Sequence, residues 1–383
     1  MNIRLFYHSI LSDWNHGNAH FLRGIVSELQ ERGHDVRVYE AENNWSLKNL
    51  SEQHGDEPVR RLRSLYPRLP SFSYDPADFD VEDVLIDADL VIVHEWNDPK
   101  LVEEIGDARR RYPFVLLFHD THHRMVTAPE EMAAYQLSNY DGVLAYGETL
   151  RQRYVAAARV PRAWTWHEAA DTRLFRPRPD IEQDADLVWI GNWGDDERSE
   201  ELNEFLIEPV KALGLRARVH GVRYPDHALA LLRDAGIEYR GWLPNFEVPD
   251  VFARHRVTVH VPRRPYTRAL PGIPTIRPFE ALACGIPLVT APWTDTENLF
   301  RPGEDFLVAR DGSEMKRALQ SLMENPAKRR TLATNGLETI RARHTCAHRV
   351  NELLEIYHQL EPSRPREPAR VGPAFVRPDV SFA

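Results

Sequence analysis

The sequence predicts an α/β protein with two successive domains, each built around a parallel sheet. With 383 residues the chain is longer than one hydrophobic core usually serves, so two domains are expected, each large enough to bury a core. Short apolar runs alternate with helical patterns along the chain, which is typical of parallel sheets covered by helices on both faces. A stretch rich in proline and charge separates two such arrays, so we expect two sheets rather than one.

The predicted strands are runs of four or five mostly apolar residues. Because ligands bind beyond the carboxyl ends of parallel strands, the loops that follow these runs are the first places to look for functional residues. In the first array the strands are Ile3–Tyr7, Val36–Tyr39, Leu90–Val93, Phe114–Phe118 and Gly142–Ala145, and in the second they are Leu187–Ile190, Ala217–His220, Val257–Val261 and Pro287–Thr290.

These strands predict the limits of the domains. The N-terminal domain spans residues 1–165, a linker spans 166–184, and the C-terminal domain spans 185–360. Residues 361–383 form a Pro/Arg-rich tail that is either flexible or packed back on the body, because it has too little apolar surface to fold alone. The segment 46–80 has no strong period, and we expect it to be an excursion over the first domain.

Charge and composition exclude several classes of function. A net charge of −10 argues against a nucleic-acid-binding surface as the main function. The two cysteines, Cys284 and Cys346, are too few for a disulfide scaffold or a cysteine-ligated zinc site, and they fit a reducing compartment. No apolar run approaches the roughly 18 residues of a membrane span, and no signal-peptide pattern follows Met1. We therefore expect a cytoplasmic protein.

The segment 276–303 predicts a short helix, a glycine stop and a buried strand. Pro278 fits only the first turn of a helix, and Gly285 suits the left-handed position just past its end. The amino end of such a helix favours an anion such as phosphate. Glu280 then lies near that end, free to accept hydrogen bonds from hydroxyl groups. The alternative is a surface glutamate in an ordinary helix–strand unit.

Two further loops that follow predicted strands contain glycine. In the loop after Leu187–Ile190, Gly191 and Asn192 would bring backbone N–H groups near an anion, and Arg198 would pair with its charge. In the loop after the first strand, His16, Gly17 and Asn18 precede a helix, and Gly17 would let the backbone approach a ligand closely while Asn18 caps the helix. The G-x-G-x-x-G spacing of a dinucleotide site is absent. A tight connecting loop is the alternative.

A third loop, FHDTHHR at 118–124, contains three histidines and an aspartate after a buried strand. Histidine and aspartate are good ligands for zinc or iron. The consecutive His122 and His123 converge poorly on one ion, however, and no H-E-x-x-H helix is present, so we predict no metal.

Four stretches carry a resemblance to a known family: DWNHGNAHFLRGIVSELQERGHDV, HEAADTRLFRP, GIPTIRPFEALACGIPLV and NPAKRRTLATNGLETIRARHT. In this order and spacing they resemble the GT-B glycosyltransferases, in particular the retaining family 4 enzymes and most of all the spore-maturation CgeB-like group. The resemblance implies two facing Rossmann-like domains. The second would hold a nucleotide-sugar donor and the first an acceptor.

The resemblance also implies roles in donor binding. Glu280 matches the second of two family glutamates spaced eight positions apart, which binds the donor ribose, whereas Gly272 stands where the first glutamate is expected. Arg277 is our preferred partner for the diphosphate, since guanidinium matches phosphate geometry. The remaining donor-side residues are Gly272, Ile273, Pro274 and Thr275, whose backbone would approach the phosphates or sugar, and Gly241, Trp242 and Leu243, which match the segment around the base.

On the acceptor side, His119 matches a family histidine that contacts the transferred sugar. Asp120 would orient that imidazole or bind an acceptor hydroxyl. Tyr146 and Glu148 follow another strand and are further candidates for acceptor binding, although Glu148 could simply favour the start of its helix. The resemblance implies retention at the anomeric carbon. A helix amino end with arginines would stabilise the leaving group without a metal, so we predict no cofactor, with a UDP-sugar as the favoured donor.

Three function classes remain open from the sequence. A glycosyltransferase is favoured over a nucleotide-sugar epimerase or hydrolase on the same fold. A non-catalytic protein that binds sugar-nucleotide or glycan is the third, and Gly272 in place of glutamate is the feature that favours it. The acceptor is a glycan, lipid, protein or small molecule. The basic run at 60–69 adds a peripheral membrane contact as an option, although such runs are usually solvated surface.

Overall fold

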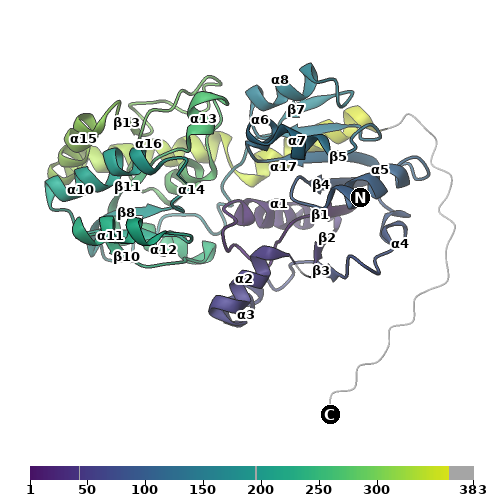
Figure 1. The fold of residues 1–383 in the computed structure, drawn as a ribbon, viewed down its shortest axis with the longest axis horizontal. Coiled ribbons are helices and arrows are strands. Elements are labelled where there is room, and N and C mark those ends of the chain that lie inside the picture. The colour runs from purple at the N-terminus through teal and green to yellow at the C-terminus, as the bar shows by residue number, and fades with distance from the viewer. Residues whose placement is uncertain (43, 195, 362–383) are drawn as a thin grey trace, which may run out of the picture.

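The computed structural model describes residues 1–42, 44–194 and 196–361. It contains two parallel sheets, one in each of two lobes that lie side by side (Figure 1). Two α/β domains with parallel sheets were predicted from the sequence, and the structure confirms them.

The first sheet has the strand order β3-β2-β1-β4-β5-β6-β7, and every pair is parallel. Helices connect the strands and cover the faces of the sheet. The strands are β1 (Asn2–Phe6), β2 (Asp35–Ala41), β3 (Ser71–Tyr74), β4 (Leu90–His94), β5 (Val115–Asp120), β6 (Gly142–Ala145) and β7 (Ala163–Thr165). The helices are α1 (Ala19–Glu31), α2 (Trp45–His54), α3 (Glu57–Leu65), α4 (Val81–Leu85), α5 (Pro99–Ala108), α6 (Arg124–Thr127), α7 (Pro129–Ala133) and α8 (Glu148–Ala156).

The second sheet repeats this plan with the order β10-β9-β8-β11-β12-β13. Its strands are β8 (Ala185–Ile190), β9 (Ala217–His220), β10 (Glu238–Tyr239), β11 (His255–His260), β12 (Leu288–Thr290) and β13 (Leu307–Val308). The α-helices are α9 (Ser199–Leu202), α10 (Glu208–Leu213), α11 (Asp226–Asp234), α12 (Val248–Ala253), α13 (Arg264–Arg268), α14 (Ile276–Cys284), α15 (Gly312–Glu324), α16 (Pro326–Arg343) and α17 (Cys346–Leu360), with a π-helical turn at Asn203–Ile207 and a 3-10 turn at Asn245–Glu247.

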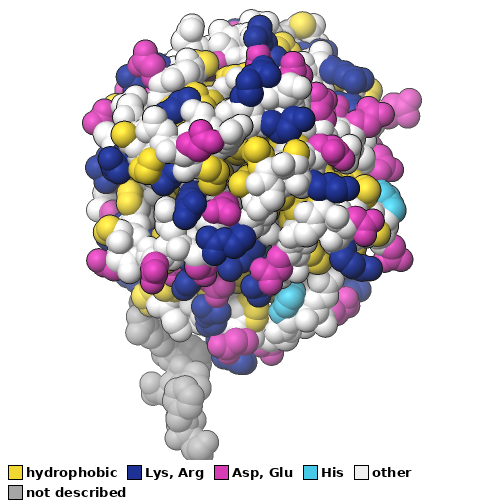
Figure 2. Space-filling model, turned by 90° about the vertical axis from the view of Figure 1, so that its left-hand side faces the viewer, with side chains coloured by type: hydrophobic (Ala, Val, Ile, Leu, Met, Phe, Trp, Pro, Cys, Tyr) yellow, Lys and Arg dark blue, Asp and Glu magenta, His cyan; other side chains and the backbone are white. Residues whose placement is uncertain are grey.

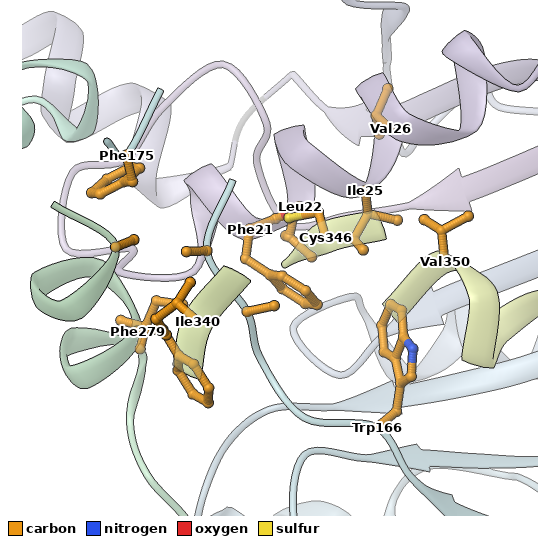
Figure 3. Packing of buried hydrophobic residues seen from close by; sticks show 14 of the residues in the cluster. Phe21, Leu22, Ile25, Val26, Trp166, Phe175, Phe279, Ile340, Cys346 and Val350 are labelled. Carbon is orange, nitrogen blue, oxygen red and sulfur yellow. Dashed lines mark hydrogen bonds between the residues drawn. The ribbon is translucent and has the colours of Figure 1, made fainter. Parts of the chain in front are cut away.

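The two domains share a continuous hydrophobic core near the linker. Phe21 and Ile25 on α1 belong to the same buried cluster as Phe279 on α14 and Val350 on α17. Trp166, at the start of the linker, completes the cluster and donates its indole N–H to the carbonyl of Arg349 at 2.8 Å. Figure 3 shows side chains of this cluster that come from α1, α14, α17 and the linker, which are far apart in the sequence.

The last helix crosses back to the first domain. Helix α17 lies against α1, and the two are tied by a hydrogen bond from Arg32 Nη1 to Asn351 Oδ1 at 2.6 Å (Figure 1). We therefore keep the limits 1–165, 166–184 and 185–360 as a proposal with one amendment, which assigns α17 to the first structural unit. The predicted tail at 361–383 lies outside the described residues except for its first position.

The surface adds two observations. Within the described ranges, no helix combines the length and the apolar character needed to cross a bilayer. On the outer end of the second lobe, basic and acidic side chains are interspersed (Figure 2).

The basic run at 60–69 falls mainly on α3, where Arg61 pairs with Glu247 of the second domain and lies 5.0 Å from the ring centre of Phe246. Part of that run therefore joins the two domains.

Candidate functional site

A cleft of about 730 Å³ lies between the two domains. Its lining comes mainly from loops at the carboxyl ends of strands in both sheets, which is where parallel α/β folds bind their ligands. The first domain supplies the loops after β1, β2, β4 and β5, and the second supplies those after β8, β9, β10 and β11 together with the start of α14. We call these two surfaces the N-terminal half and the C-terminal half of the cleft.

The amino end of α14 opens onto this cleft. Thr275, Ile276 and Arg277 all belong to the lining. Thr275 is the N-cap residue, but its hydroxyl makes no capping bond and instead lies 3.0 Å from Nε2 of His260. The side chain thus leaves the first N–H groups of the helix without an internal cap, and they are available to an anion. Gly285 ends the helix in the left-handed conformation, with φ of 68°, as its sequence predicts.

Four arginines bring positive charge to the C-terminal half: Arg198, Arg223, Arg263 and Arg277. Arg198 is 9% exposed and donates to the carbonyls of Val261 at 2.9 Å and Asn192 at 2.6 Å, while its guanidinium lies 5.0 Å from the ring centre of Trp189. Burial lowers the pKa of Arg198 to about 9, so it stays charged at neutral pH. Its hydrogen bonds are to carbonyls, so its charge is not matched by a hydrogen-bonded carboxylate among the described residues.

Arg263 and Arg277 each have a carboxylate partner. Arg263 bonds Glu197 at 3.1 Å, and the same carboxylate lies 3.7 Å from Nε2 of His123 across the cleft. Arg277 donates to Glu280, three residues along α14. An anionic ligand at this end of α14 would therefore compete with two carboxylates for two guanidinium groups.

Glu280 itself is fully buried and is not part of the cleft lining. One carboxylate oxygen accepts from Arg277, and the other lies 3.0 Å from Nδ1 of His20 on α1. The predicted contact with a donor ribose would thus require Arg277 to move away from the carboxylate.

Of the segment from Gly272 to Thr275, only Thr275 lines the cleft. Gly272, with φ of 89°, lies so close to Thr296 that an added Cβ would be 2.0 Å from its hydroxyl. Ile273 is fully buried against Gly147 of the first domain, and Pro274 is also buried. Of these three residues, Ile273 is the one that contacts the first domain, through Gly147.

The glycine loop after β8 does reach the cleft. Gly191 and Asn192 line it, and the Asn192 side chain donates to Oδ1 of Asn15 in the first domain. Its own Oδ1 accepts from the backbone N–H of Val222 at 3.0 Å. Asn192 therefore fixes three loops around the cleft.

Trp242 and Leu243, predicted to surround the donor base, line the C-terminal half. The Trp242 ring centre lies 4.6 Å from that of His54 on α2. Gly241 is not in the lining, and its carbonyl accepts from the N–H of Gly221 at 2.8 Å.

On the other side, His16, Gly17 and Asn18 all line the cleft. An added Cβ on Gly17 would lie 3.4 Å from the side chain of Ile276, so the glycine lets this loop approach the start of α14. Asn18 precedes α1 but makes no side-chain cap. His16 is 7% exposed, and neither ring nitrogen has a hydrogen-bond partner within the described part of the chain.

His119 and Asp120 do not line the cleft. His119 is fully buried, with its ring centre 4.9 Å from that of Trp166 and 5.2 Å from that of His94. Asp120 accepts from the Tyr154 hydroxyl at 2.7 Å and from the N–H of His122 at 3.0 Å, and burial raises its pKa to about 6. Asp120 thus holds the turn after β5 in place.

That turn presents His122 and His123 to the cleft. Both follow the same strand as His119, but three and four positions further on, beyond the last hydrogen bonds of β5. Burial is the main cause that lowers the pKa of His123 to about 4 and the pKa of His122 well below its ordinary value. Neither histidine was among the residues predicted from the sequence to contact a ligand.

Tyr146 and Glu148 are also absent from the lining. Tyr146 is 2% exposed and packs near Tyr266. Glu148 begins α8, where it bonds Arg151 and accepts from the Thr165 hydroxyl at 2.7 Å, and the hydrogen bond from Arg151 is the main cause that lowers its pKa to about 2. Tyr146 thus packs near a residue of the second domain, on α13, and Glu148 makes bonds within the first domain.

Sequence reasoning missed the aromatic lining of the N-terminal half. Trp45 follows β2, and Trp96 follows β4. His8, two residues past the end of β1, lies between them, with ring centres 4.9 Å from Trp45 and 6.5 Å from Trp96. Their position just after parallel strands is the signal that could have found them.

Comparison with known proteins gives a consistent picture. A family model described as glycosyl transferase-like matches residues 198–355, and a model described as glycosyltransferase family 4 matches residues 17–174. No curated protein matches the chain in sequence.

Solved structures share the fold over nearly the whole chain. A sucrose-phosphate synthase from Thermosynechococcus elongatus is 14% identical, with a TM-score of 0.64, and the match covers 94% of this chain and 99% of that one. Anabaena HepE in complex with UDP and glucose is 15% identical, with a TM-score of 0.67 and coverage of 94% and 100%. An alpha-glucosyltransferase in complex with UDP and DNA is 11% identical, with a TM-score of 0.67 and coverage of 94% and 99%.

Both family models describe glycosyl transfer, and the solved structures have the same two-domain architecture. The chain is therefore a glycosyltransferase built on the GT-B architecture.

Proposed function

We propose that the enzyme moves a sugar from a UDP-sugar to an acceptor, with retention at the anomeric carbon and without a metal. The observation that carries the proposal is the open amino end of α14, which faces a cleft lined by Arg198, Arg263 and Arg277. A helix end and guanidinium groups stabilise the charge that develops on a departing nucleoside diphosphate. HepE and the alpha-glucosyltransferase, which share this fold, were solved with UDP, and this supports the choice of base.

The residue roles follow from the cleft. Arg277 and the N–H groups at the start of α14 bind the diphosphate, and Trp242 with Leu243 contacts the base. Glu280 binds the ribose once Arg277 has turned to the phosphates. In retaining transfer of this kind, an oxygen of the leaving diphosphate assists deprotonation of the acceptor hydroxyl. For contact with the transferred sugar we propose His122 and His123 in place of His119, because these two imidazoles reach the cleft.

We also propose that the protein is similar to the CgeB-like group and that it is located in the cytoplasm. The likeness to the CgeB-like group rests on the four sequence motifs. A cytoplasmic location is supported by Cys284 and Cys346, which are buried free thiols.

Calorimetric titration with UDP, UDP-glucose, GDP and ADP tests donor binding. We expect UDP and UDP-glucose to bind, and the affinity of each to be the same with and without EDTA. We expect NMR of the transfer product to show the same anomeric configuration as the donor. Failure of every nucleotide to bind would contradict the proposal. Consumption of the donor without any acceptor would indicate a hydrolase or an epimerase, and an inverted product would exclude retention.

A further inference from the structure

The two halves of the cleft differ in charge. The C-terminal half contains Arg198, Arg223, Arg263 and Arg277. No described lining residue of the N-terminal half is a lysine or an arginine. The one carboxylate in that half, Asp13, is already paired with Arg23 at 3.1 Å. The positive charge therefore lies entirely on the side assigned to the diphosphate, as far as the described lining extends.

The histidines of the N-terminal half do not change this balance near neutral pH. Burial is the main cause that lowers the pKa of His8 to about 4 and that of His16 to about 3. His122 and His123 are shifted in the same direction by the same cause. All four rings are therefore uncharged at pH 7.

Aromatic rings form a continuous wall in this half. Trp45 and His8 have ring centres 4.9 Å apart, and His8 leads to Trp96 at 6.5 Å. Trp96 is followed by His122 at 5.2 Å. Both tryptophans are half-buried and line the cavity, so part of each indole faces the open space.

Unsatisfied polar atoms accompany this wall. Among the described residues, no hydrogen-bond partner is present for buried Nε2 of His8, both ring nitrogens of His16 and Nδ1 of His122. His8 and His16 are each only 7% exposed, so the cost of leaving these atoms unpaired is high. A bound molecule with hydroxyl groups would supply the missing partners.

We propose that the N-terminal half of the cleft is an acceptor site for an uncharged carbohydrate. A sugar ring presents apolar C–H faces to indole and hydroxyl groups to imidazole nitrogen, which matches Trp45 and Trp96 with His8 and His16. A phosphorylated acceptor, an anionic lipid or a nucleic acid would meet no lysine or arginine in the described lining of this half, since Arg124, 4.0 Å from the ring centre of Trp96, lies outside that lining and pairs with Glu95. It would also be repelled by the donor's diphosphate. This inference rests on the proposed function, since it names the acceptor class for the same cleft.

Saturation-transfer NMR on the full chain tests the proposal, because it detects the protons of the saccharide and needs no donor. The probes are neutral mono- to tetrasaccharides of glucose, galactose, mannose and N-acetylglucosamine, compared with glucose 6-phosphate and phosphatidylglycerol vesicles. The variants are Trp45→Ala and Trp96→Ala, with Trp45→Phe and Trp96→Phe as controls that keep an aromatic face.

We expect at least one neutral saccharide to bind, each alanine variant to weaken it roughly threefold to tenfold, and the phenylalanine variants to restore most of the affinity. UDP affinity, measured by calorimetry, should not change, which shows that the variants fold. Absence of binding by every neutral saccharide, or affinities unchanged in both alanine variants, would overturn the proposal. So would glucose 6-phosphate or vesicles binding more tightly in a tryptophan-dependent way. If UDP fails to bind the unmodified chain while a saccharide binds through the tryptophans, the proposed donor is wrong and the acceptor site stands.

Discussion

The two halves of the cleft are built at equivalent places on equivalent sheets, yet they present opposite chemistry. In the C-terminal half a helix end and four arginines provide positive charge. In the N-terminal half, tryptophans and uncharged histidines occupy the loops after β1, β2, β4 and β5. The sheets place the loops, whereas the side chains after each strand decide what the loops bind. A shared fold therefore predicts the position of a site better than its ligand.

The largest expected effect concerns Arg198 in the C-terminal half. Arg198→Ala should reduce UDP affinity roughly 100-fold, because a hydrogen bond to a charged group contributes about 1.5–3 kcal/mol and this side chain also fixes the loops at Asn192 and Val261. Calorimetry with UDP measures the loss, and thermal unfolding checks that the variant folds. The UDP affinity of Arg198→Lys should lie between those of the alanine variant and the unmodified chain, since lysine keeps the charge but cannot reach all the carbonyls. Unchanged affinity in a folded alanine variant would show that this charge does not serve the donor.

Much of the fold was predictable because it depends on local pattern. All nine predicted strands form within the described residues, with ends shifted by at most two positions. Four edge strands, β3, β7, β10 and β13, were not predicted from the sequence. They are only two to four residues long and none is fully buried, so they lack the apolar run that is typical of a central strand. Helix α14 was placed correctly because Pro278 and Gly285 restrict where a helix can begin and end.

The site was less predictable because it depends on which way each side chain points. His119 and His122 lie in the same short motif, but His119 is still within β5 and faces the interior, whereas His122 lies past the end of the strand. A motif match cannot separate them. Trp45 and Trp96 are far apart in the sequence, and both lie near His8 in one cleft because β2 and β4 flank β1 in the sheet. That proximity follows from strand order, which the sequence pattern did not provide.

The uncharged histidines of the N-terminal half give a second prediction, which concerns the pH dependence of protein stability. The pKa of His8 falls from 6.5 in the unfolded chain to about 4 in the folded protein, so between these values the unfolded state binds the additional proton. The neutral His8 ring therefore contributes its full share to the free energy of unfolding above pH 6.5. That share is lost as the pH falls toward 4, by on the order of 2–3 kcal/mol. Urea unfolding at pH 7, 5.5 and 4.5 should show a smaller decline for His8→Asn than for the unmodified chain. Equal declines would mean that His8 is protonated readily in the folded state.

A smaller effect is expected for Arg277. This variant tests whether a contact at the start of α14, rather than general positive charge, binds the donor. Arg277→Gln should weaken UDP binding roughly tenfold, since it removes one charge-assisted contact at the start of α14. Arg264→Gln is the matched control: Arg264 is also an arginine near this site and pairs with Glu201, but it does not line the cleft. Its UDP affinity should equal that of the unmodified chain. Equal losses in the two variants would show that general charge, rather than a contact at α14, attracts the donor.

The smallest expected effect lies at the seam between the two halves, where the side chain of Asn192 donates to Asn15. Asn15 has a positive φ of 51°, which glycine adopts freely and alanine does not. Asn15→Gly should therefore remove the hydrogen bond alone and weaken UDP binding roughly threefold, because a neutral hydrogen bond contributes about 0.5–1.5 kcal/mol. Asn15→Ala adds backbone strain and should also lower the melting temperature. If the glycine variant binds UDP as well as the unmodified chain, the C-terminal half holds the donor without help from the first domain, and the two halves work more independently than their contact indicates.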